Sequence, residues 1–466
     1  MLDKSIFEGM WKLPEHTEYK CFGKLTFDPE NNITLNTIGN LCQKKHCRGP
    51  HEFDYIHGIT MNGEKITLYK STGRDSYPIP GIPSAYFHSE FIIIGGHLNN
   101  IDDLEITSSA IHLTYLDEWV NKNGFNMPFS NSKKIFAKVK YTQPRPIILA
   151  KNRIFKISLW FSASFSPGNS EALIKQKVYL NINYYKNQST NLLDLLEIIY
   201  RARNFLTFAT SRLVLVSEVS LNHEGRYKGN YKIFFKNPIH KQLDTFVPTF
   251  HMLFAYEDVE NNIQVIFNNW LQKYDVLLPV FKLYFNVIYS QNVYAENLFL
   301  NLVFALETYH RRTNNRTQID PVEFQILVKM ILEKAGENKK WISDKLQYSN
   351  ELSLRARLKE ITSKHEDILK QIEPALSSFL HKVVSTRNYL THYSESLKAF
   401  SMNGKELEES NHTLFLLITI CLLDELAFNK KEIEEALHRS TWSVFRITEK
   451  RKLQRKELSP EAKKLK

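Results

Sequence analysis

The sequence predicts a multidomain α+β protein in which a β-rich N-terminal region, a sandwich or a barrel, precedes an all-α helical bundle. Its 466 residues are more than a single compact domain usually holds. Eleven of the sixteen glycines lie in residues 1–128, whereas residues 291–447 contain two glycines and two prolines. Apolar residues form short strand-like runs in the first region and recur at helical spacing in the last. The chain therefore divides into a β-rich and a helical part.

The β-rich region is placed at residues 1–245. Its clearest elements are two β-hairpins, one around the turn Asp28–Asn32 and one around Asn62-Gly63. A helix is predicted at residues 192–210, where the apolar residues take up helical spacing. Further strands are expected at residues 91–94, 135–141, 154–161, 178–184, 213–219 and 232–235.

The helical part begins with a connector at residues 246–290, in which Pro279 is expected to separate two long helices. A helical bundle is placed at residues 291–447. Within it, Asp320-Pro321 is a start signal, because an N-cap carboxylate precedes a proline at the first helical position. Four or five helices are expected to pack together. They are predicted at residues 294–311, from 321 through the stripe Phe324, Leu327, Val328, Ile331 and Leu332, at 374–390 and at 407–428.

Composition limits the class of protein. At 43% hydrophobic and 24% charged residues, the chain is neither disordered nor fibrous. The formal net charge of +11 suits an anionic partner without identifying one, and a basic tail at residues 448–466 carries nearly half of it. Four irregularly spaced cysteines make no disulfide framework, and neither a signal peptide nor a membrane-spanning run is evident. We therefore expect a soluble cytoplasmic protein without a membrane partner.

Common catalytic signatures are absent from the sequence: no zincin motif, phosphate-binding loop or nucleophile elbow is complete. Cys42 and Cys47 have zinc-compatible side chains, but their spacing is loose and an ordinary polar loop is the favoured alternative. Glu307 and His310 form a Glu-x-x-His pair of the kind found in di-iron bundles, yet no second such pair exists. The sequence therefore predicts no cofactor and leaves metal binding at Cys42 and Cys47 open.

One polar constellation remains, at the end of the helix predicted at residues 374–390. Arg387 occupies a position in an otherwise apolar seam, and its permanent charge needs a partner or an anionic ligand there. Asn388 and His392 are four residues apart and share the neighbouring stripe. Glu307, on an apolar helix, could pair with Arg387 or orient His392. The alternative interpretation is a structural Arg387–Glu307 ion pair beside a surface histidine.

A second segment nearly repeats this constellation. Arg203-Asn204-Phe205-Leu206-Thr207-Phe208 has the same order of residue types, with Phe208 where His392 stands. The same packing of a helix end can therefore be built without an imidazole. His392 is not required by the packing pattern.

At these residues the sequence resembles a known family. Arg387–Tyr393 resembles the R-[polar]-x3-H motif of HEPN domains, helical-bundle ribonucleases that cleave RNA without metal. Phe304–Arg311 is similar to the first-helix signature of the ApeA-like HEPN branch, in which Glu307 is the acidic residue. The N-terminal half is similar to the β-rich domain of ApeA-type anti-phage proteins, at Gly9–Pro14, Tyr55–Thr60 and Asp117–Trp119. The basic tail does not match the family pattern.

The resemblance implies a metal-independent RNA endonuclease that acts in anti-phage defence by abortive infection. In such an enzyme the 2'-hydroxyl of the RNA attacks the phosphate, with His392 moving a proton near neutral pH and Arg387 stabilising charge on the phosphoryl oxygens. Asn388 is expected to orient the phosphate or the imidazole, and Glu307 to hold Arg387 or His392. RNA is the implied partner, with tRNA as one candidate, and a phage protein is a candidate trigger that the N-terminal region would sense.

Helix geometry adds a constraint. Residues five apart on a helix are about 140° apart, so Arg387 and His392 of one chain converge poorly on one phosphate. Two motifs facing across a symmetric cleft would solve this, and HEPN nucleases are similar in requiring such pairing, so we expect a homodimer or a higher even oligomer. Two alternatives stay open: a non-catalytic HEPN module that binds RNA or protein, and a carbohydrate- or protein-binding β-rich half with an oligomerising bundle.

Overall fold

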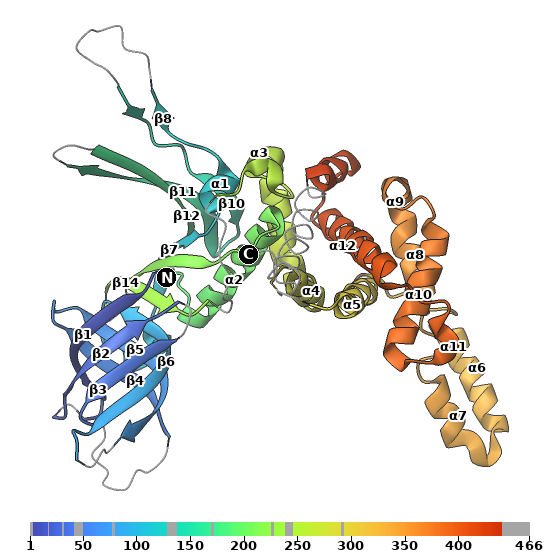
Figure 1. Ribbon diagram of the computed structural model, residues 1–466, viewed down its shortest axis with the longest axis horizontal. Helices are drawn as coiled ribbons and strands as arrows, with labels where there is room; N and C mark the ends of the chain where they lie inside the picture. Colours follow the sequence, from blue (N-terminus) through green and yellow to red (C-terminus); the bar gives the residue numbers. More distant parts are fainter. Residues whose placement is uncertain are drawn as a thin grey trace, which may run out of the picture. The chain divides into compact units, whose positions relative to one another are not determined.

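The protein is described by a computed structural model that covers residues 3–16, 18–29, 32–41, 50–76, 80–127, 138–168, 172–224, 228–237, 246–289 and 293–439. Contacts between residues divide the chain into two compact units, with the division between Asn268 and Asn269. The first unit is β-rich and the second is helical (Figure 1). This order of elements confirms the predicted fold class.

Six antiparallel strands close a barrel at the start of the first unit (Figure 1). Their order around the barrel is β1-β2-β3-β6-β5-β4, and β4 returns to pair with β1. The two predicted hairpins are confirmed as the pairs β2/β3 and β4/β5. The strands are β1 (Ser5–Lys12), β2 (Cys21–Phe27), β3 (Ile33–Ile38), β4 (His51–Thr60), β5 (Lys65–Ser76) and β6 (Ser84–Ile94).

Alternation along β1 decides which side chains fill this barrel. Trp11 is fully buried, and its indole nitrogen donates to the carbonyl oxygen of Gly23 at 3.0 Å. A Cβ atom at Gly58, the β4 residue opposite Trp11, would lie 2.3 Å from the indole ring, so only glycine fits beneath it. Met10 and Lys12, the neighbours of Trp11, face the outside.

A second antiparallel sheet continues from the barrel through β6, in the order β10-β11-β12-β7-β13-β14. Ser84–Ser89 of β6 pair with β3, whereas Phe91–Ile94 pair with β14, so this strand belongs to both sheets. Of the predicted strand at 135–141, residues 135–137 lie outside the described part, residues 138 and 139 are not in a strand, and residues 140–141 form β9. The strands of this sheet are β7 (Ile106–Leu113), β10 (Ile147–Lys151), β11 (Phe155–Pro167), β12 (Ala172–Tyr184), β13 (Val216–His223) and β14 (Gly229–Phe235). The short strands β8 (Phe125–Asn126) and β9 (Lys140–Tyr141) pair with each other as a separate two-stranded sheet.

Short helices and one long helix complete the first unit: α1 (Leu116–Val120), α2 (Leu192–Thr210) and α3 (Tyr256–Val259). The predicted helix at 192–210 is confirmed with the same bounds. Trp119 of α1 is buried against it, with its ring 5.9 Å from that of Phe205 in a T-shaped arrangement. Its indole nitrogen donates to the carbonyl oxygen of Phe254 at 3.1 Å, so burial leaves no polar atom of the indole unpaired.

The helices of the second part are α4 (Ile263–Tyr289), α5 (Ala295–Thr313), α6 (Pro321–Lys334), α7 (Lys339–Leu346), α8 (Leu354–Lys364), α9 (Glu366–Ile372), α10 (Leu376–His392), α11 (Glu395–Lys398) and α12 (Gly404–Glu425), and residues 430–439 are also helical. The prediction that Pro279 separates two helices is wrong, since α4 runs through it. Leu277, Val280 and Phe281 are buried on either side of the proline. Their packing outweighs the lost backbone hydrogen bond, a cost of about 3 kcal/mol.

The core of the helical unit lies where α5 and α12 pack together. Leu302 and Leu306 of α5 are fully buried, and so is Ile418 of α12. Tyr284 of α4 stacks on Phe415 with ring centroids 4.9 Å apart, and its hydroxyl lies 3.2 Å from that of Thr419. The helix α10 contributes the buried Phe379, Leu380, Val383 and Thr386. This core fixes the relative positions of α5 and α10, which carry the candidate site.

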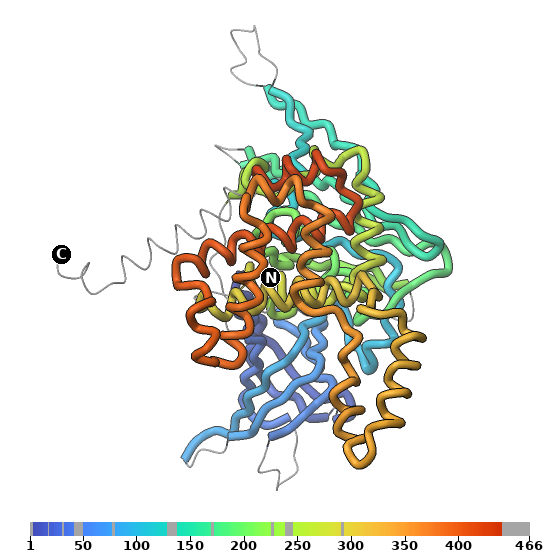
Figure 2. Tube along the Cα trace, turned by 90° about the vertical axis from the view of Figure 1, so that its right-hand side faces the viewer, coloured from blue at the N-terminus to red at the C-terminus, as the bar shows by residue number. Residues whose placement is uncertain are grey.

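The helix α6 differs from its prediction. Its start is confirmed, because Asp320 accepts hydrogen bonds from the backbone nitrogens of Val322 and Glu323. Its apolar stripe was expected to enter the bundle, yet no residue of α6 is buried. Instead α6 forms a hairpin with α7 that projects from the other helices of this unit, yellow-orange in Figure 2 (Figures 1 and 2). Ile326 and Met330 are 55% and 51% exposed, because no other described element covers this face.

Candidate active site at the end of α10

The exposed His392 is the last residue of α10. The helix ends because Tyr393 adopts a left-handed conformation, with φ of 49°, while its nitrogen still donates to the carbonyl oxygen of Tyr389. The hydroxyl of Thr391 donates to the carbonyl oxygen of Arg387 at 2.7 Å within this last turn. No hydrogen bond or ion pair joins His392 to another described residue. Its imidazole is therefore open to a ligand or to a second chain.

Arg387 lies one helical turn before this end and is only 25% exposed in its side chain. Its Nη2 atom lies 3.4 Å from Oε2 of Glu307, and its Nη1 donates to Oδ1 of Asn388 at 3.0 Å. The Nε–H group is buried and has no partner in the described part of the chain. The guanidinium of Arg387 is therefore held through its Nη atoms, and its Nε–H donor has no partner among the described residues. Its positive charge lies in a partly dry environment.

The structure decides between the two partners considered for Glu307. This carboxylate, on α5, contacts Arg387 on α10, and no contact with His392 is present among the described residues. Its second oxygen, Oε1, lies 3.2 Å from Nη2 of Arg311, four residues further along α5. One carboxylate, 16% exposed, therefore lies between two guanidinium groups. Glu307 thus holds Arg387 in place while Arg311 holds Glu307 from the other side.

Arg311 extends the site into a network that sequence reasoning missed. Its Nη1 atom also contacts Glu351, and Glu351 in turn lies 3.4 Å from Nη2 of the buried Arg357. Burial alone would lower the pKa of Arg311, but its bonds to Glu351 and Glu307 outweigh this and raise the pKa. The spacing of Glu307 and Arg311, four residues apart on one helix, was the available signal. No sequence pattern indicated Arg357, since α8 lies elsewhere in the chain.

His310, the other half of the Glu-x-x-His pair, is buried in this network. Arg357 donates to its Nδ1 atom at 3.2 Å, so Nε2 carries the proton and donates to Glu360 at 2.9 Å. Both ring nitrogens are thus occupied by protein groups.

Within the described ranges, no three His, Cys, Asp or Glu side chains come together as a metal site would need. Cys42 and Cys47, and the basic tail at 448–466, lie outside the described residues.

Two family models match this chain. The model described as ApeA N-terminal domain 1 matches residues 6–270, which is more than half of the sequence. The chain belongs to the ApeA family. The model described as Apea-like HEPN matches residues 300–432, and this range contains Glu307, Arg387, Asn388 and His392. No curated protein and no solved structure matches the sequence.

For this ApeA-family protein the two matches follow the two kinds of structure. The match to ApeA N-terminal domain 1 covers the barrel, the other antiparallel sheet and α1 to α3. The match to Apea-like HEPN covers most of α5 and the helices through α12. The family suggested by the motifs is therefore confirmed, and the protein is a HEPN-containing member of an anti-phage defence family. None of the helices in the described ranges combines the length and the apolar composition that crossing a membrane requires.

Proposed function

We propose that this ApeA-family protein is a metal-independent RNA endonuclease that acts in anti-phage defence by abortive infection. One observation carries the proposal: a half-buried Arg387, held by Glu307 and Asn388, precedes an open His392 at the end of the same helix. A fixed cation stabilises charge that develops on phosphoryl oxygens, and an exposed imidazole can act as a general acid or base. These are the two groups that cleavage of RNA through its own 2'-hydroxyl needs.

The proposed reaction transfers a phosphoryl group within the RNA. The 2'-oxygen attacks the adjacent phosphorus, the bond from phosphorus to the 5'-oxygen breaks, and a 2',3'-cyclic phosphate and a 5'-hydroxyl remain. One imidazole takes the proton from the 2'-hydroxyl, and a protonated imidazole gives one to the departing 5'-oxygen. Arg387 stabilises the negative charge on the non-bridging oxygens as the new bond forms.

Glu307 and Asn388 are proposed to position Arg387 for this step. Glu307 accepts hydrogen bonds from Nη2 of Arg387 and from Nη2 of Arg311. These two bonds restrain the rotamer of Arg387. The Oδ1 atom of Asn388 already accepts from Arg387. Its NH2 group therefore remains available to donate to a phosphate oxygen or to an imidazole.

A homodimer formed through the helical units is proposed to complete the active site. Arg387 and His392 are five residues apart on one helix, about 140° around its axis, and no contact joins them among the described residues. A twofold axis near the end of α10 would place His392 of one chain opposite Arg387 of the other. In this arrangement residues 291–447 form the nuclease, residues 246–290 connect it, and residues 1–245 sense a phage protein or restrain cleavage.

Cleavage of RNA by the wild-type protein and two variants tests this proposal. The proteins are expressed in bacteria and also purified, then incubated with total RNA, tRNA included, in the presence of a chelator. RNA ends are mapped for new 5'-hydroxyl groups. We expect cleavage by the wild type and its loss in Arg387→Ala and His392→Ala, whereas Arg203→Ala, at the related position of α2, cleaves normally. Equal cleavage by all four proteins would refute the proposal.

A second function, a non-catalytic HEPN module that binds RNA or protein, is favoured by one observation. The Arg387–Glu307 pair satisfies part of the guanidinium without any ligand, as a structural ion pair would. In that case His392→Ala leaves RNA intact and growth unaffected, and Arg387→Ala acts by unfolding the helical unit. Thermal unfolding of both variants, measured beside the cleavage assay, separates the two functions.

A further inference from the structure

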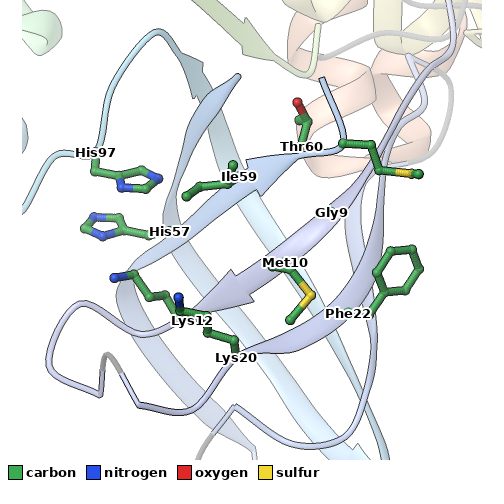
Figure 3. Close-up of a pocket in the computed structure, with 10 residues that line it drawn as sticks. Gly9, Met10, Lys12, Lys20, Phe22, His57, Ile59, Thr60 and His97 are labelled. Atoms are coloured by element: carbon green, nitrogen blue, oxygen red, sulfur yellow. The ribbon is translucent and has the colours of Figure 1, made fainter. Parts of the chain in front are cut away.

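The outer face of the N-terminal barrel carries a pocket that the proposed nuclease site does not use. It has a volume of about 280 Å³ and lies on β1, β2, β4 and the segment after β6 (Figure 3). Much of its lining comes from Gly9–Pro14 and Tyr55–Thr60, two of the segments in which the family resemblance was found. A pocket of this size is at the lower limit for small-molecule sites, large enough for one compact ligand.

The strand register builds an apolar row in this pocket. Met10 on β1 lies opposite Phe22 on β2 and also opposite Ile59 on β4. The three side chains are exposed, while the next residue, Trp11, points into the barrel. Neighbouring strands are about 4.8 Å apart, so the row is a continuous apolar surface about the width of an aromatic ring system.

A cationic row lies beside the apolar one, two residues further along β1. Lys12 is opposite His57 in the register, and Lys20 lines the same side of the pocket just before β2 (Figure 3). No carboxylate is among the described residues that line the pocket. Two residues of a strand span about 7 Å, which sets the separation between the apolar and the cationic rows.

Two histidines add hydrogen-bond acceptors next to Lys12. The rings of His57 and His97 stack with centroids 4.5 Å apart and planes 2° from parallel (Figure 3). Nε2 of His57 donates to the carbonyl oxygen of Leu98, and Nε2 of His97 donates to that of Gly58, both at 2.8 Å. Burial lowers the pKa of both rings, so both are neutral at pH 7 and each Nδ1 atom is an acceptor.

We propose that this pocket binds a nucleotide unit, with the base on Met10, Phe22 and Ile59 and the phosphate on Lys12 and Lys20. The ribose between them offers hydroxyl donors to the acceptor nitrogens of His57 and His97. A fatty acid lacks those donors, and a free phosphate leaves the apolar row uncovered. A nucleotide combines a flat base, ribose hydroxyls and an anionic phosphate. These three parts match the apolar row, the histidine pair and the cationic row.

Calorimetric titration of the full chain tests the site. The four ribonucleoside 5'-monophosphates, the four nucleosides and inorganic phosphate are titrated separately, and so is a 5'-phosphorylated RNA trinucleotide. We expect a monophosphate or the trinucleotide to bind at least tenfold more tightly than the nucleoside or phosphate alone. Binding of a monophosphate assigns a free nucleotide, and binding of the trinucleotide alone assigns a nucleotide within an RNA chain.

Variants locate the binding. Lys12→Gln and Lys20→Gln are each expected to weaken it about tenfold, because each removes one charged contact to phosphate. Lys24→Gln is the matched control, since Lys24 lies on β2 outside the pocket and pairs with Glu8 at 4.0 Å. The proposal fails if neither ligand binds, if nucleosides bind as well as nucleotides, if Lys24→Gln weakens binding equally, or if only an acidic peptide such as polyglutamate binds. Because the helical unit is unchanged in these variants, RNA cleavage reports separately on the nuclease.

Discussion

Two helices, α2 and α10, carry nearly the same six residues in different surroundings. In both, the arginine contacts the asparagine that follows it: Arg203 donates to Asn204 at 3.1 Å and Arg387 to Asn388 at 3.0 Å. Beyond this local contact they diverge. Phe208 is fully buried near the end of α2, whereas His392 is exposed at the end of α10.

The difference between the two arginines shows what makes a site. Arg203 packs over the ring of Tyr200, 5.1 Å from its centre, and forms no ion pair with another described residue. Arg387 instead meets Glu307, a carboxylate from α5 that another arginine also holds. The local sequence builds the arginine–asparagine contact, and the neighbouring helix supplies the charge arrangement. A motif match therefore becomes a candidate site only with its partner from α5.

The last residues of the two segments should respond in opposite ways. Replacing His392 with alanine is expected to reduce RNA cleavage about 10²- to 10⁴-fold, the contribution of a general acid or base, and to change the free energy of unfolding by less than about 0.5 kcal/mol. Phe208→Ala should destabilise the first unit by about 3–5 kcal/mol, because it opens a cavity. Rates under single-turnover conditions and chemical denaturation measure both. A large loss of stability in His392→Ala would contradict the comparison.

The two arginines provide the next contrast. Arg387→Ala is expected to lower the cleavage rate about 10²- to 10³-fold, the effect of removing one fixed donor from a developing oxyanion. Arg387→Lys should recover little of it, because an ammonium cannot keep both the Glu307 and the Asn388 contacts. Arg203→Ala should cleave at the wild-type rate. If Arg387→Ala and Arg203→Ala lose activity equally, both act by disturbing the fold, and a catalytic role for Arg387 is excluded.

Glu307 tests whether positioning matters. Glu307→Gln keeps the shape of the side chain but removes the charge between Arg387 and Arg311. We expect a loss of about tenfold in cleavage, smaller than for Arg387, because Glu307 acts through its neighbour. Arg311→Gln should lose less, since the Oε2 atom of Glu307 still faces Arg387. An unchanged rate in Glu307→Gln would exclude a positioning role.

The helix α6 extends the comparison to stability, where the smallest effect is expected. Ile326→Gln on the exposed face of α6 should change the free energy of unfolding by less than about 0.5 kcal/mol. Leu302→Ala in the buried α5 should cost about 2–5 kcal/mol. Urea denaturation at one protein concentration measures both. A large loss in Ile326→Gln would mean that this face is covered in solution.

Local patterns predicted the elements well where propensity and packing agree. The hairpins at Asp28–Asn32 and Asn62-Gly63, the helix α2 and the cap at Asp320 follow from turn residues, periodicity and capping, all of which act within a few residues. The predictions for Pro279 and for α6 were wrong because the burial of side chains in the folded protein determines the structure at these two places. Pro279 stays inside α4 because residues on both sides of it are buried, and α6 keeps its apolar face exposed because α7 alone among the described helices packs closely on α6.

The sequence by itself determined the family, the order of a β-rich and a helical part, and the identity of Arg387, Asn388, His392 and Glu307 as the residues to examine. Only the tertiary structure decided that the β-rich part closes a barrel, that Glu307 contacts Arg387 and not His392, and that Arg311 shares this carboxylate. The reason is physical. Spacing along one helix fixes which side chains share a face, whereas ion pairs between helices depend on a core assembled from residues far apart in the chain.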